Sequence, residues 1–267
     1  MQHQTKHRAK KSLGQNFLKS KPALKKMVSS AEIGPKDTVL EIGPGKGALT
    51  KELLATGATV VAVEKDDLLI PILEETFKNE LKIGKFKLLH GDALEIDLIK
   101  SGISGKNWKL VANIPYYITG LLIRHYLESE NQPKSMTILV QKEVAERVVA
   151  KDGKESILSL SVKLFGEPKY MGTVSKRYFS PAPKVDSAIL YIGNIHHSYD
   201  SADEKSFFEL IKLAFGHKRK TILHNLGKTY SKEAVKAALI ALDKGESARA
   251  EELNINNWKT FYSFLQK

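Results

Sequence analysis

The chain has 267 residues, of which 42% are hydrophobic and 27% are charged, and it contains no cysteine. This composition excludes wholesale disorder and a fibrous repeat, and it excludes a disulfide framework, a zinc ribbon and a cysteine nucleophile. The 42 Lys and Arg residues outnumber the 30 Asp and Glu residues by 12, which favours a nucleic acid or another polyphosphate as the partner. No apolar run is long enough to span a membrane, and no apolar stretch follows the charged start, so we expect neither a membrane span nor a signal peptide.

The positive charge is concentrated in two parts of the chain. Eight basic residues precede the first acidic residue, Glu32, and we assign residues 1–30 to a basic N-terminal segment: Lys6, Arg8, Lys10, Lys11, Lys19, Lys21, Lys25 and Lys26. A second cluster lies near the C-terminus: Lys212, Lys218, Arg219 and Lys220. Both clusters are typical of an RNA-binding surface, for which affinity falls steeply with salt. The alternative is a solvated basic tail that aids solubility.

Short aliphatic and β-branched runs alternate with helical patterns over the first two thirds of the chain. The runs predict strands over 38–42, 59–64, 86–92, 109–116 and 136–141. Apolar residues at helical spacing predict helices over 48–55, 67–77, 119–128 and 157–165, with Thr119 as the N-cap of the third. This alternation is typical of parallel βαβ units.

The end of the sheet and the C-terminal part follow a different pattern. Two runs, 170–179 and 184–192, have no helix between them and predict an antiparallel pair at the edge of the sheet. A polar stretch follows, and then come helical patterns over 207–215, 231–242 and 256–265. We therefore expect an α/β domain over 31–194, with a mostly parallel sheet and an antiparallel C-terminal edge strand, and a small all-α domain over 195–267.

A glycine-rich turn joins the first predicted strand to the next helix. Gly43, Gly45 and Gly47 allow the backbone to turn sharply and approach a ligand, and the helix N-terminus adds N–H dipoles. Glu64 ends the second strand, 21 positions after Gly43, where a carboxylate can accept both hydroxyls of a ribose. These features serve NAD and S-adenosylmethionine equally, and the alternative is a tight turn with no ligand.

Two further strand ends distinguish these cofactors. Asp92 follows the third strand, where a carboxylate can bind an exocyclic adenine amine or merely cap a turn. The fourth strand ends in Asn113-Ile114-Pro115-Tyr116, and ligands of open α/β sheets lie at the carboxyl ends of strands.

The chemistry of this Asn-Ile-Pro-Tyr motif suits transfer to a base amine. The Asn113 side-chain carbonyl and the Ile114 backbone carbonyl can accept both N–H groups of a nucleobase amine and favour a tetrahedral, nucleophilic nitrogen. Pro115 restricts the backbone of Ile114, and Tyr116 offers a ring on which an extruded base can stack. Positioning and electrostatics then carry the reaction without a strong general base. The alternative is a strand-ending turn in which Pro115 and Tyr116 pack locally.

The ordered set of motifs resembles the S-adenosylmethionine-dependent rRNA adenine N6-methyltransferases over residues 10–267. The resemblance rests on the following segments: KSLGQNFL (11–18), VLEIGPGKGALT (39–50), VEKD (63–66), GDAL (91–94), NIPY (113–116), FSPAPKVDSAIL (179–190) and AFGHKRKTILHNL (214–226). The chain is most similar to the bacterial small-subunit type, which dimethylates two adjacent adenosines near the 3′ end of 16S rRNA. The resemblance implies a Rossmann-like class I methyltransferase sheet.

The resemblance also implies roles for individual residues. The residues implied to bind S-adenosylmethionine are Asn16, Leu18, Gly43, Glu64, Asp92 and Asn113. The residues implied to hold the target adenine are Asn113, Ile114, Pro115, Tyr116 and Phe179. Phe179 would stack on the face of the base opposite Tyr116, whereas without the family it is more simply a core aromatic at a strand end. No metal is expected.

The resemblance sets the expected partners and leaves alternatives. We expect small-subunit rRNA and the assembling small ribosomal subunit as partners, no membrane contact, a monomer and a cytoplasmic location. One alternative is a macrolide-resistance methyltransferase, which modifies large-subunit rRNA. The others are a ribosome-assembly factor that mainly binds RNA and, less consistent with the Asn-Ile-Pro-Tyr motif, an NAD oxidoreductase.

Overall fold

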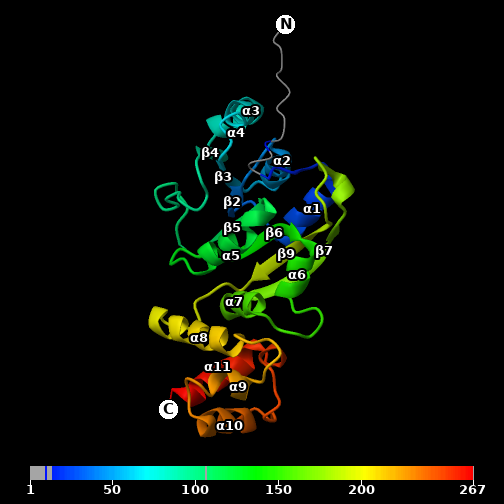
Figure 1. The fold of residues 1–267 in the computed structure, drawn as a ribbon. Coiled ribbons are helices and arrows are strands. Elements are labelled where there is room, and N and C mark those ends of the chain that lie inside the picture. Colours follow the sequence, from blue (N-terminus) through cyan, green and yellow to red (C-terminus); the bar gives the residue numbers. More distant parts are fainter. Residues whose placement is uncertain (1–9, 11–13, 106, 267) are drawn as a thin grey trace. The chain divides into compact units, whose positions relative to one another are not determined.

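The computed structural model describes residues 10, 14–105 and 107–266, and the chain divides into two compact units. The first unit contains the chain up to Ala145 together with Glu167–Ile195, and the second contains Glu146–Gly166 and the chain from His196 onward. Figure 1 labels most of the helices and strands of both units. The expected domain limits, 31–194 and 195–267, differ from this division because residues 146–166 group with the C-terminal helices.

The first unit is built on a seven-stranded sheet of order β4-β3-β2-β5-β6-β9-β7. Neighbouring strands from β4 to β6 pair in parallel, whereas β9 is antiparallel to both β6 and β7. The expected α/β class with an antiparallel C-terminal edge is therefore confirmed. The strands are β2 (Thr38–Ile42), β3 (Thr59–Glu64), β4 (Phe86–His90), β5 (Trp108–Asn113), β6 (Ser135–Gln141), β7 (Glu167–Val174) and β9 (Ser187–Gly193).

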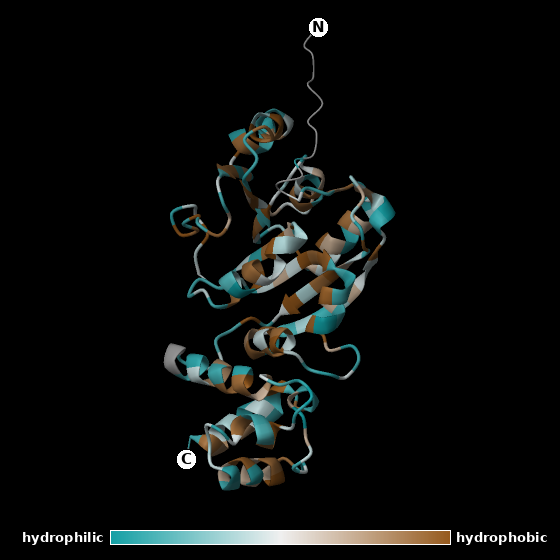
Figure 2. Cartoon of the chain, viewed as in Figure 1, coloured by the Kyte–Doolittle hydropathy of each residue, from teal (hydrophilic) through white to brown (hydrophobic). Residues whose placement is uncertain are grey.

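Helices cover both faces of this sheet. They are α1 (Lys21–Ser30), α2 (Ala48–Leu54), α3 (Ile70–Thr76), α4 (Lys78–Lys82) and α5 (Thr119–Leu127). One core cluster contains buried residues of α1, α2 and α3 with alternate residues of the strands, such as Val39 and Val111. From α5, the buried ring of Tyr126 packs edge-on against Trp108, with 6.0 Å between the ring centroids. In Figure 2 the central strands carry mostly the hydrophobic colour and the helices carry both, as expected for a sheet buried between helical layers.

A second, two-stranded sheet connects distant parts of the first unit. In it β1 (Phe17–Leu18) pairs antiparallel with β8 (Phe179–Ser180), so that Leu18 lies opposite Phe179. A strand of two residues has no hydrophobic period, which is why sequence patterns do not predict either one. This sheet places part of the basic N-terminal segment beside the Phe179 segment.

The structure corrects several expected elements of the first unit. The expected strand 170–179 ends at Val174, and a 3-10 turn (Lys176–Tyr178) separates it from β8. Thr119 is the first residue of α5 rather than its N-cap, and no side chain caps that helix, because a 3-10 turn (Tyr116–Ile118) leads directly into it. A short helix that was not expected, α6 (Lys142–Val148), follows β6 and continues into the second unit.

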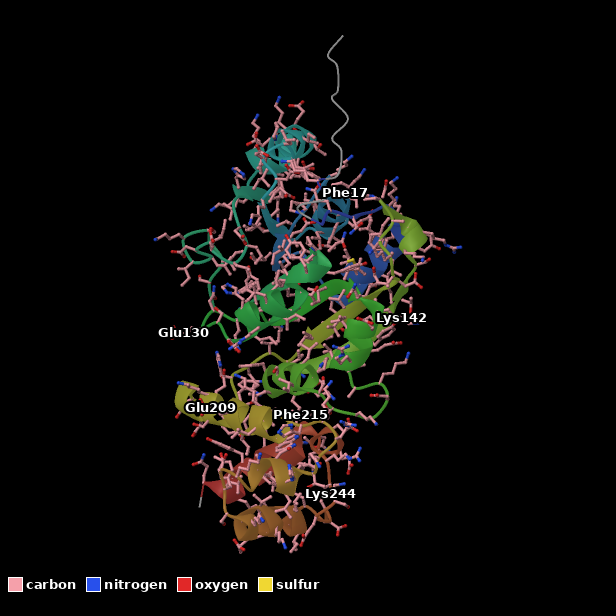
Figure 3. The ribbon with its side chains drawn as sticks, in the orientation of Figure 1. Phe17, Glu130, Lys142, Glu209, Phe215 and Lys244 are labelled. Carbon is pink, nitrogen blue, oxygen red and sulfur yellow. The ribbon has the colours of Figure 1, made fainter. Side chains whose placement is uncertain are left out.

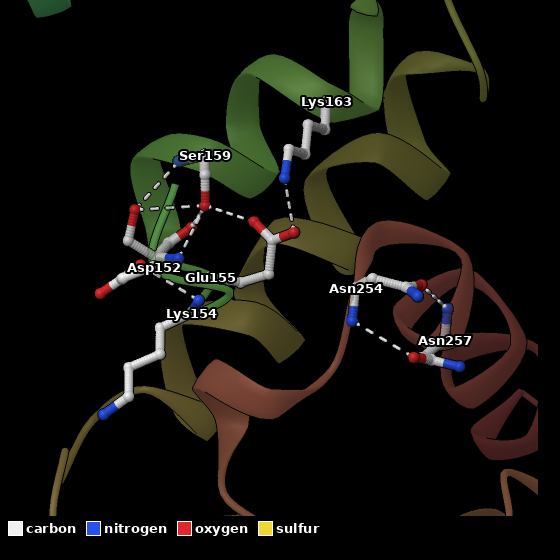
Figure 4. Close-up of polar contacts among 8 residues, drawn as sticks. Asp152, Lys154, Glu155, Ser159, Lys163, Asn254 and Asn257 are labelled. Carbon is white, nitrogen blue, oxygen red and sulfur yellow. Dashed lines mark hydrogen bonds and ion pairs between the residues drawn. The ribbon is translucent and has the colours of Figure 1, made fainter. Parts of the chain in front are cut away.

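The second unit is helical. Its elements are α7 (Ile157–Phe165), α8 (Ser201–Ala214), α9 (Ile222–Leu226), α10 (Lys232–Ala241), a 3-10 turn (Ala250–Glu252) and α11 (Ile255–Leu265). The Ser156 and Asn254 side chains each accept the backbone N–H three residues on, and capping boxes start α7 and α11 (Figure 4). Glu155 accepts a hydrogen bond from the Ser159 hydroxyl at 2.6 Å and pairs with Lys163 at 2.6 Å, which fixes the start of α7.

Candidate active site

A cavity of about 490 Å³ lies in the first unit at the carboxyl ends of β2, β3, β4 and β5. Its walls are the segments that follow these strands, residues 14–19 of the N-terminal segment, and Phe179. All the site residues that the sequence and the resemblance predict line this one cavity: Asn16, Leu18, Gly43, Glu64, Asp92, Asn113, Ile114, Pro115, Tyr116 and Phe179. The parallel topology explains the convergence, because parallel strands present their carboxyl ends at one edge.

The three glycines of the turn after β2 serve different purposes. Gly43 has φ +66°, and a Cβ built there meets no heavy atom within 4 Å, so a side chain would enter the cavity. A Cβ on Gly45 would approach the ring of Phe17 to 2.9 Å, and Figure 3 shows Phe17 beside α2. A Cβ on Gly47, which caps α2 at φ +78°, would clash with the ring of Phe77. Gly43 therefore keeps ligand space open, whereas the other two permit close packing.

Glu64 presents a carboxylate whose orientation is fixed by the backbone. Its Oε2 accepts the N–H of Gly45 at 3.0 Å, and its Oε1 accepts the N–H of Asp66 at 2.8 Å. The side chain is buried, and burial raises its pKa. Each oxygen keeps a second lone pair, so the carboxylate can accept two hydroxyl groups of a ligand.

Asp92 forms the turn contact that its position predicts, and it also lines the cavity. Its Oδ1 accepts the N–H of Leu94 at 3.0 Å, as in a turn aspartate, and its Oδ2 forms an ion pair with the Lys65 ammonium at 2.7 Å. The bond to Lys65 lowers the pKa of Asp92 and keeps it ionised. The turn alternative is therefore observed, and it is compatible with ligand binding because Asp92 also lines the cavity.

The Asn113 amide is oriented by the N-terminal segment. Its Nδ2 donates to the Asn16 carbonyl at 3.3 Å, and the Nδ2 of Asn16 donates to the Gly14 carbonyl at 3.1 Å. Because the nitrogen end of the Asn113 amide is engaged in this way, its Oδ1 is the end available to accept an N–H from the cavity. Pro115 follows with φ −59°, which restricts the backbone of the buried Ile114.

Two aromatic residues complete the wall that follows β5. The Tyr116 hydroxyl forms a hydrogen bond of 2.7 Å with the hydroxyl of Ser187, a buried residue of β9, and this bond fixes the ring. Phe179 is only 6% exposed and belongs to the hydrophobic core cluster, as does its strand partner Leu18. Phe179 is thus both a core aromatic and a wall of the cavity. Tyr117, which also lines the cavity, is 68% exposed.

Glu41 is a cavity residue that sequence reasoning missed. It lies in β2, is 1% exposed and lines the cavity, and neither carboxyl oxygen has a hydrogen-bond partner of good geometry among the described residues. Burial raises its pKa to about 8, although the nearby Thr50 partly opposes this. The signal was an acidic residue inside the apolar strand TVLEI. The fixed carboxylate acceptor at Glu64 and the open space at Gly43 fit a ligand with a ribose, as S-adenosylmethionine has.

The second unit carries the C-terminal basic cluster. Lys218, Arg219 and Lys220 are exposed between α8 and α9. The buried Asn225 of α9 donates to the carbonyls of Ala214 and His217 at 2.7 and 3.2 Å and so fixes both ends of this turn. The expected basic residues Lys6, Arg8 and Lys11 lie outside the described residues.

The described part of the chain shows neither a cluster of metal ligands nor a membrane-spanning helix. No group of three or more His, Asp or Glu side chains there could hold a metal ion. No helix within residues 14–105 or 107–266 is long and apolar enough to cross a membrane.

The mostly parallel sheet, its glycine turn and the acidic residues at successive strand ends define the class of S-adenosylmethionine-dependent methyltransferases with a Rossmann-like fold. The family model described as ribosomal RNA adenine dimethylase matches residues 6–267, so the chain belongs to that family.

Known relatives and solved structures agree with this membership. The chain is 42% identical over 257 residues to the ribosomal RNA small subunit methyltransferase A of Dehalococcoides mccartyi, covering 94% of this chain and 87% of the relative. Among solved structures, the 23S rRNA methyltransferase ErmE is similar with a TM-score of 0.79 and 26% identity, covering 94% of this chain and 100% of that one. A dimethyladenosine transferase from Plasmodium falciparum has a TM-score of 0.75 and 28% identity, covering 92% and 95%.

Proposed function

We propose that this protein transfers methyl groups from S-adenosylmethionine to N6 of two adjacent adenosines near the 3′ end of 16S rRNA, giving N6,N6-dimethyladenosine during ribosome biogenesis. The observation that carries the proposal is the convergence of an oriented Asn113 amide, a fixed Tyr116 ring and acidic acceptors in one cavity. The small-subunit assignment is supported by a relative of that name at 42% identity.

The cofactor is held by residues of successive strand ends. Glu64 accepts the ribose hydroxyls, and Asp92 accepts the exocyclic amine of the cofactor adenine. Gly43 lets the backbone approach the ligand, and Asn16 and Leu18 close the pocket from the N-terminal side. When bound, S-adenosylmethionine supplies an electrophilic methyl group on its sulfonium.

The target adenine is activated by hydrogen bonding rather than by a strong base. Asn113 Oδ1 and the Ile114 carbonyl accept the two N–H groups of the amine, which concentrates the nitrogen lone pair toward the methyl group. Tyr116 stacks on one face of the extruded base and Phe179 on the other, which excludes water and limits its motion. The nitrogen becomes acidic once it is alkylated, so its proton leaves without a dedicated base. The protein contributes positioning and electrostatics.

The test is a methyl-transfer assay on small ribosomal subunits that lack the modification, with large subunits in parallel. Labelled S-adenosylmethionine and the purified protein are added, and the rRNA is digested for mass spectrometry. We expect dimethyladenosine in 16S rRNA, lost in Asn113→Ala and retained in the matched control Asn79→Ala, an exposed amide on α4. Label in large-subunit rRNA alone would move the assignment to the macrolide-resistance type. The structural similarity to ErmE, a 23S rRNA methyltransferase, makes this parallel measurement necessary.

The same assay distinguishes an enzyme from an assembly factor. Cofactor binding without transfer to either subunit would contradict catalysis and favour a role in RNA binding alone. We further propose that the protein acts as a monomer in the cytoplasm on the assembling small subunit, without membrane contact. The state of assembly is tested by light scattering with and without substrate RNA, where a mass of twice the chain would contradict the monomer.

A further inference from the structure

A second cavity of about 720 Å³ lies beside the active site in the first unit. Its walls are the start of α1, residues 171–174 of β7 and the 3-10 turn Lys176–Tyr178. Lys19 lines both this cavity and the active-site cavity. The two are therefore neighbours across the β1–β8 sheet, and we call this second cavity the lysine groove.

The lysine groove is strongly basic. Four exposed cations line it, and no acidic residue does: Lys19, Lys21, Lys26 and Arg177. None of these four takes part in an ion pair within the described part of the chain. A concave surface with four uncompensated charges has a positive potential that attracts a polyanion.

The placement of these charges opposes the stability of the helix beside them. Lys21 occupies the first position of α1, and no acidic residue lies in the first turn. A cation at this end faces the positive end of the helix dipole, where a negative group would be favourable. An anionic ligand in the groove relieves this repulsion.

An aromatic residue that lines the groove directly precedes Phe179 in the chain. Tyr178 is 37% exposed, and the Arg177 guanidinium lies 5.0 Å from its ring centroid and donates to its hydroxyl at 3.0 Å. The Tyr178 carbonyl accepts the N–H of Lys19 at 2.8 Å, and the next residue is Phe179, the wall of the active-site cavity. A ring supported by an arginine, with lysines around it, combines base stacking with phosphate contacts, which is how proteins hold single-stranded nucleic acid.

We infer that the lysine groove binds the single-stranded RNA that directly flanks the target adenosines. The strand leaves the adenine pocket past Phe179 and Lys19, its phosphates contact Lys21, Lys26 and Arg177, and a flanking base stacks on Tyr178. This inference rests on the proposed function, because it requires an RNA strand whose adenosine enters the active-site cavity.

The test compares two double variants that remove the same charge from the full-length protein. Lys21→Ala/Lys26→Ala removes two cations from the groove. Lys78→Ala/Lys82→Ala removes two exposed cations from α4, which packs on β4 at the opposite edge of the sheet from β7. All four positions are exposed on helices, where alanine is well tolerated, and circular dichroism confirms folding.

Binding and kinetics are measured on unmodified small subunits and on a short RNA that carries the target adenosines. For the groove variant we expect the KM for RNA to rise on the order of tenfold, and the salt slope of binding to weaken by about 1.4 for two lost phosphate contacts. We expect kcat and S-adenosylmethionine binding to stay unchanged, and the α4 variant to match the wild type. Equal KM values and equal salt slopes for the two variants would overturn the inference that the lysine groove binds RNA.

Photo-crosslinking gives an independent location. A short RNA with 4-thiouridine next to the target adenosines is irradiated with the wild-type protein, and crosslinked peptides are identified by mass spectrometry. Crosslinks to Tyr178 and residues 19–26 are expected, and crosslinks confined to other surfaces would overturn the inference. Absence of methyl transfer by the wild type would instead refute the proposed function, so the two failures are distinguishable.

Discussion

The buried carboxyl of Glu41 makes the stability of the first unit depend on pH in an unusual direction. Burial raises the pKa of Glu41 from an ordinary 4.5 to about 8, with the neighbouring Glu64 charge contributing. The folded protein therefore keeps this proton over a pH range in which the unfolded chain has lost it. By linkage, the contribution of protonated Glu41 to the free energy of unfolding is fully present below pH 4.5 and is lost as pH rises toward 8.

The magnitude follows from the two pKa values. Each pKa unit corresponds to about 1.4 kcal/mol, so the rise from 4.5 to about 8 amounts to about 5 kcal/mol of unfolding free energy. The Glu41→Gln variant keeps the size of the side chain and removes its ionisation. Its stability advantage over the wild type is expected to grow by about 1.4 kcal/mol for each pH unit between pH 5 and pH 8.

The assay is urea unfolding at several pH values, followed by fluorescence. A Trp258→Phe background leaves Trp108 as the only tryptophan, and Trp108 lies in β5 of the first unit, so the signal reports on that unit. The control is Glu75→Gln, which makes the same chemical change at an exposed acid of α3. A pH-independent difference for Glu41→Gln would refute the reasoning, because it would mean that Glu41 is ionised in the folded protein.

Three further predictions concern the cavity and its partner. Gly43→Ala is expected to weaken S-adenosylmethionine binding at least tenfold in calorimetry, with little effect on stability beyond the strain of its positive φ. Gly47→Ala places a methyl group against the Phe77 ring and is expected to lower the unfolding free energy by about 1–3 kcal/mol. Tyr116→Phe loses the hydrogen bond to Ser187, which is expected to lower the unfolding free energy by about 1 kcal/mol while methyl transfer is retained. Tyr116→Ala also loses base stacking, which is expected to raise the activation free energy of transfer by about 1–3 kcal/mol. Equal transfer rates for the two variants would contradict a stacking role. RNA affinity is expected to fall steeply with added salt in filter binding, and a flat dependence would contradict an electrostatic interface.

The sequence predicts the sheet well and its edges poorly. The runs 38–42 and 59–64 match β2 and β3 residue for residue, because a strand buried on both faces is a continuous apolar run between turns. The run 170–179 was predicted as one strand, yet it forms β7, a 3-10 turn and β8. A hydrophobic pattern shows which segments can form strands, but it does not show which strand each one pairs with. The partner of β8 is β1, more than 150 positions earlier in the chain.

The helix 157–165 shows the same limit at the level of domains. Its periodicity predicts the helix and its limits correctly, as α7. Which unit it joins depends on packing that periodicity does not encode: the ring of Phe165 stacks with Phe208 of α8, 6.3 Å between centroids, and its carbonyl accepts the N–H of His196. The chain thus leaves the first unit before α7 and returns for β7, so a single boundary near residue 194 could not describe it.

The active site separates what topology determines from what only folding reveals. Glu64, Asp92 and Asn113 lie at or just after the carboxyl ends of three different strands, and a parallel sheet brings such positions together at one edge. The sheet topology does not determine where residues 14–19 of the N-terminal segment lie, although they also line the cavity. Their position depends on contacts such as the ion pair of Lys10 with Asp66, at 2.6 Å, and the hydrogen bond from Gln15 to the same carboxylate at 2.8 Å. Because these contacts join the N-terminal segment to the loop that follows Glu64, they position together the residues that we propose close the cavity and the carboxylate that we propose binds the ribose. Loss of either contact is expected to weaken cofactor binding.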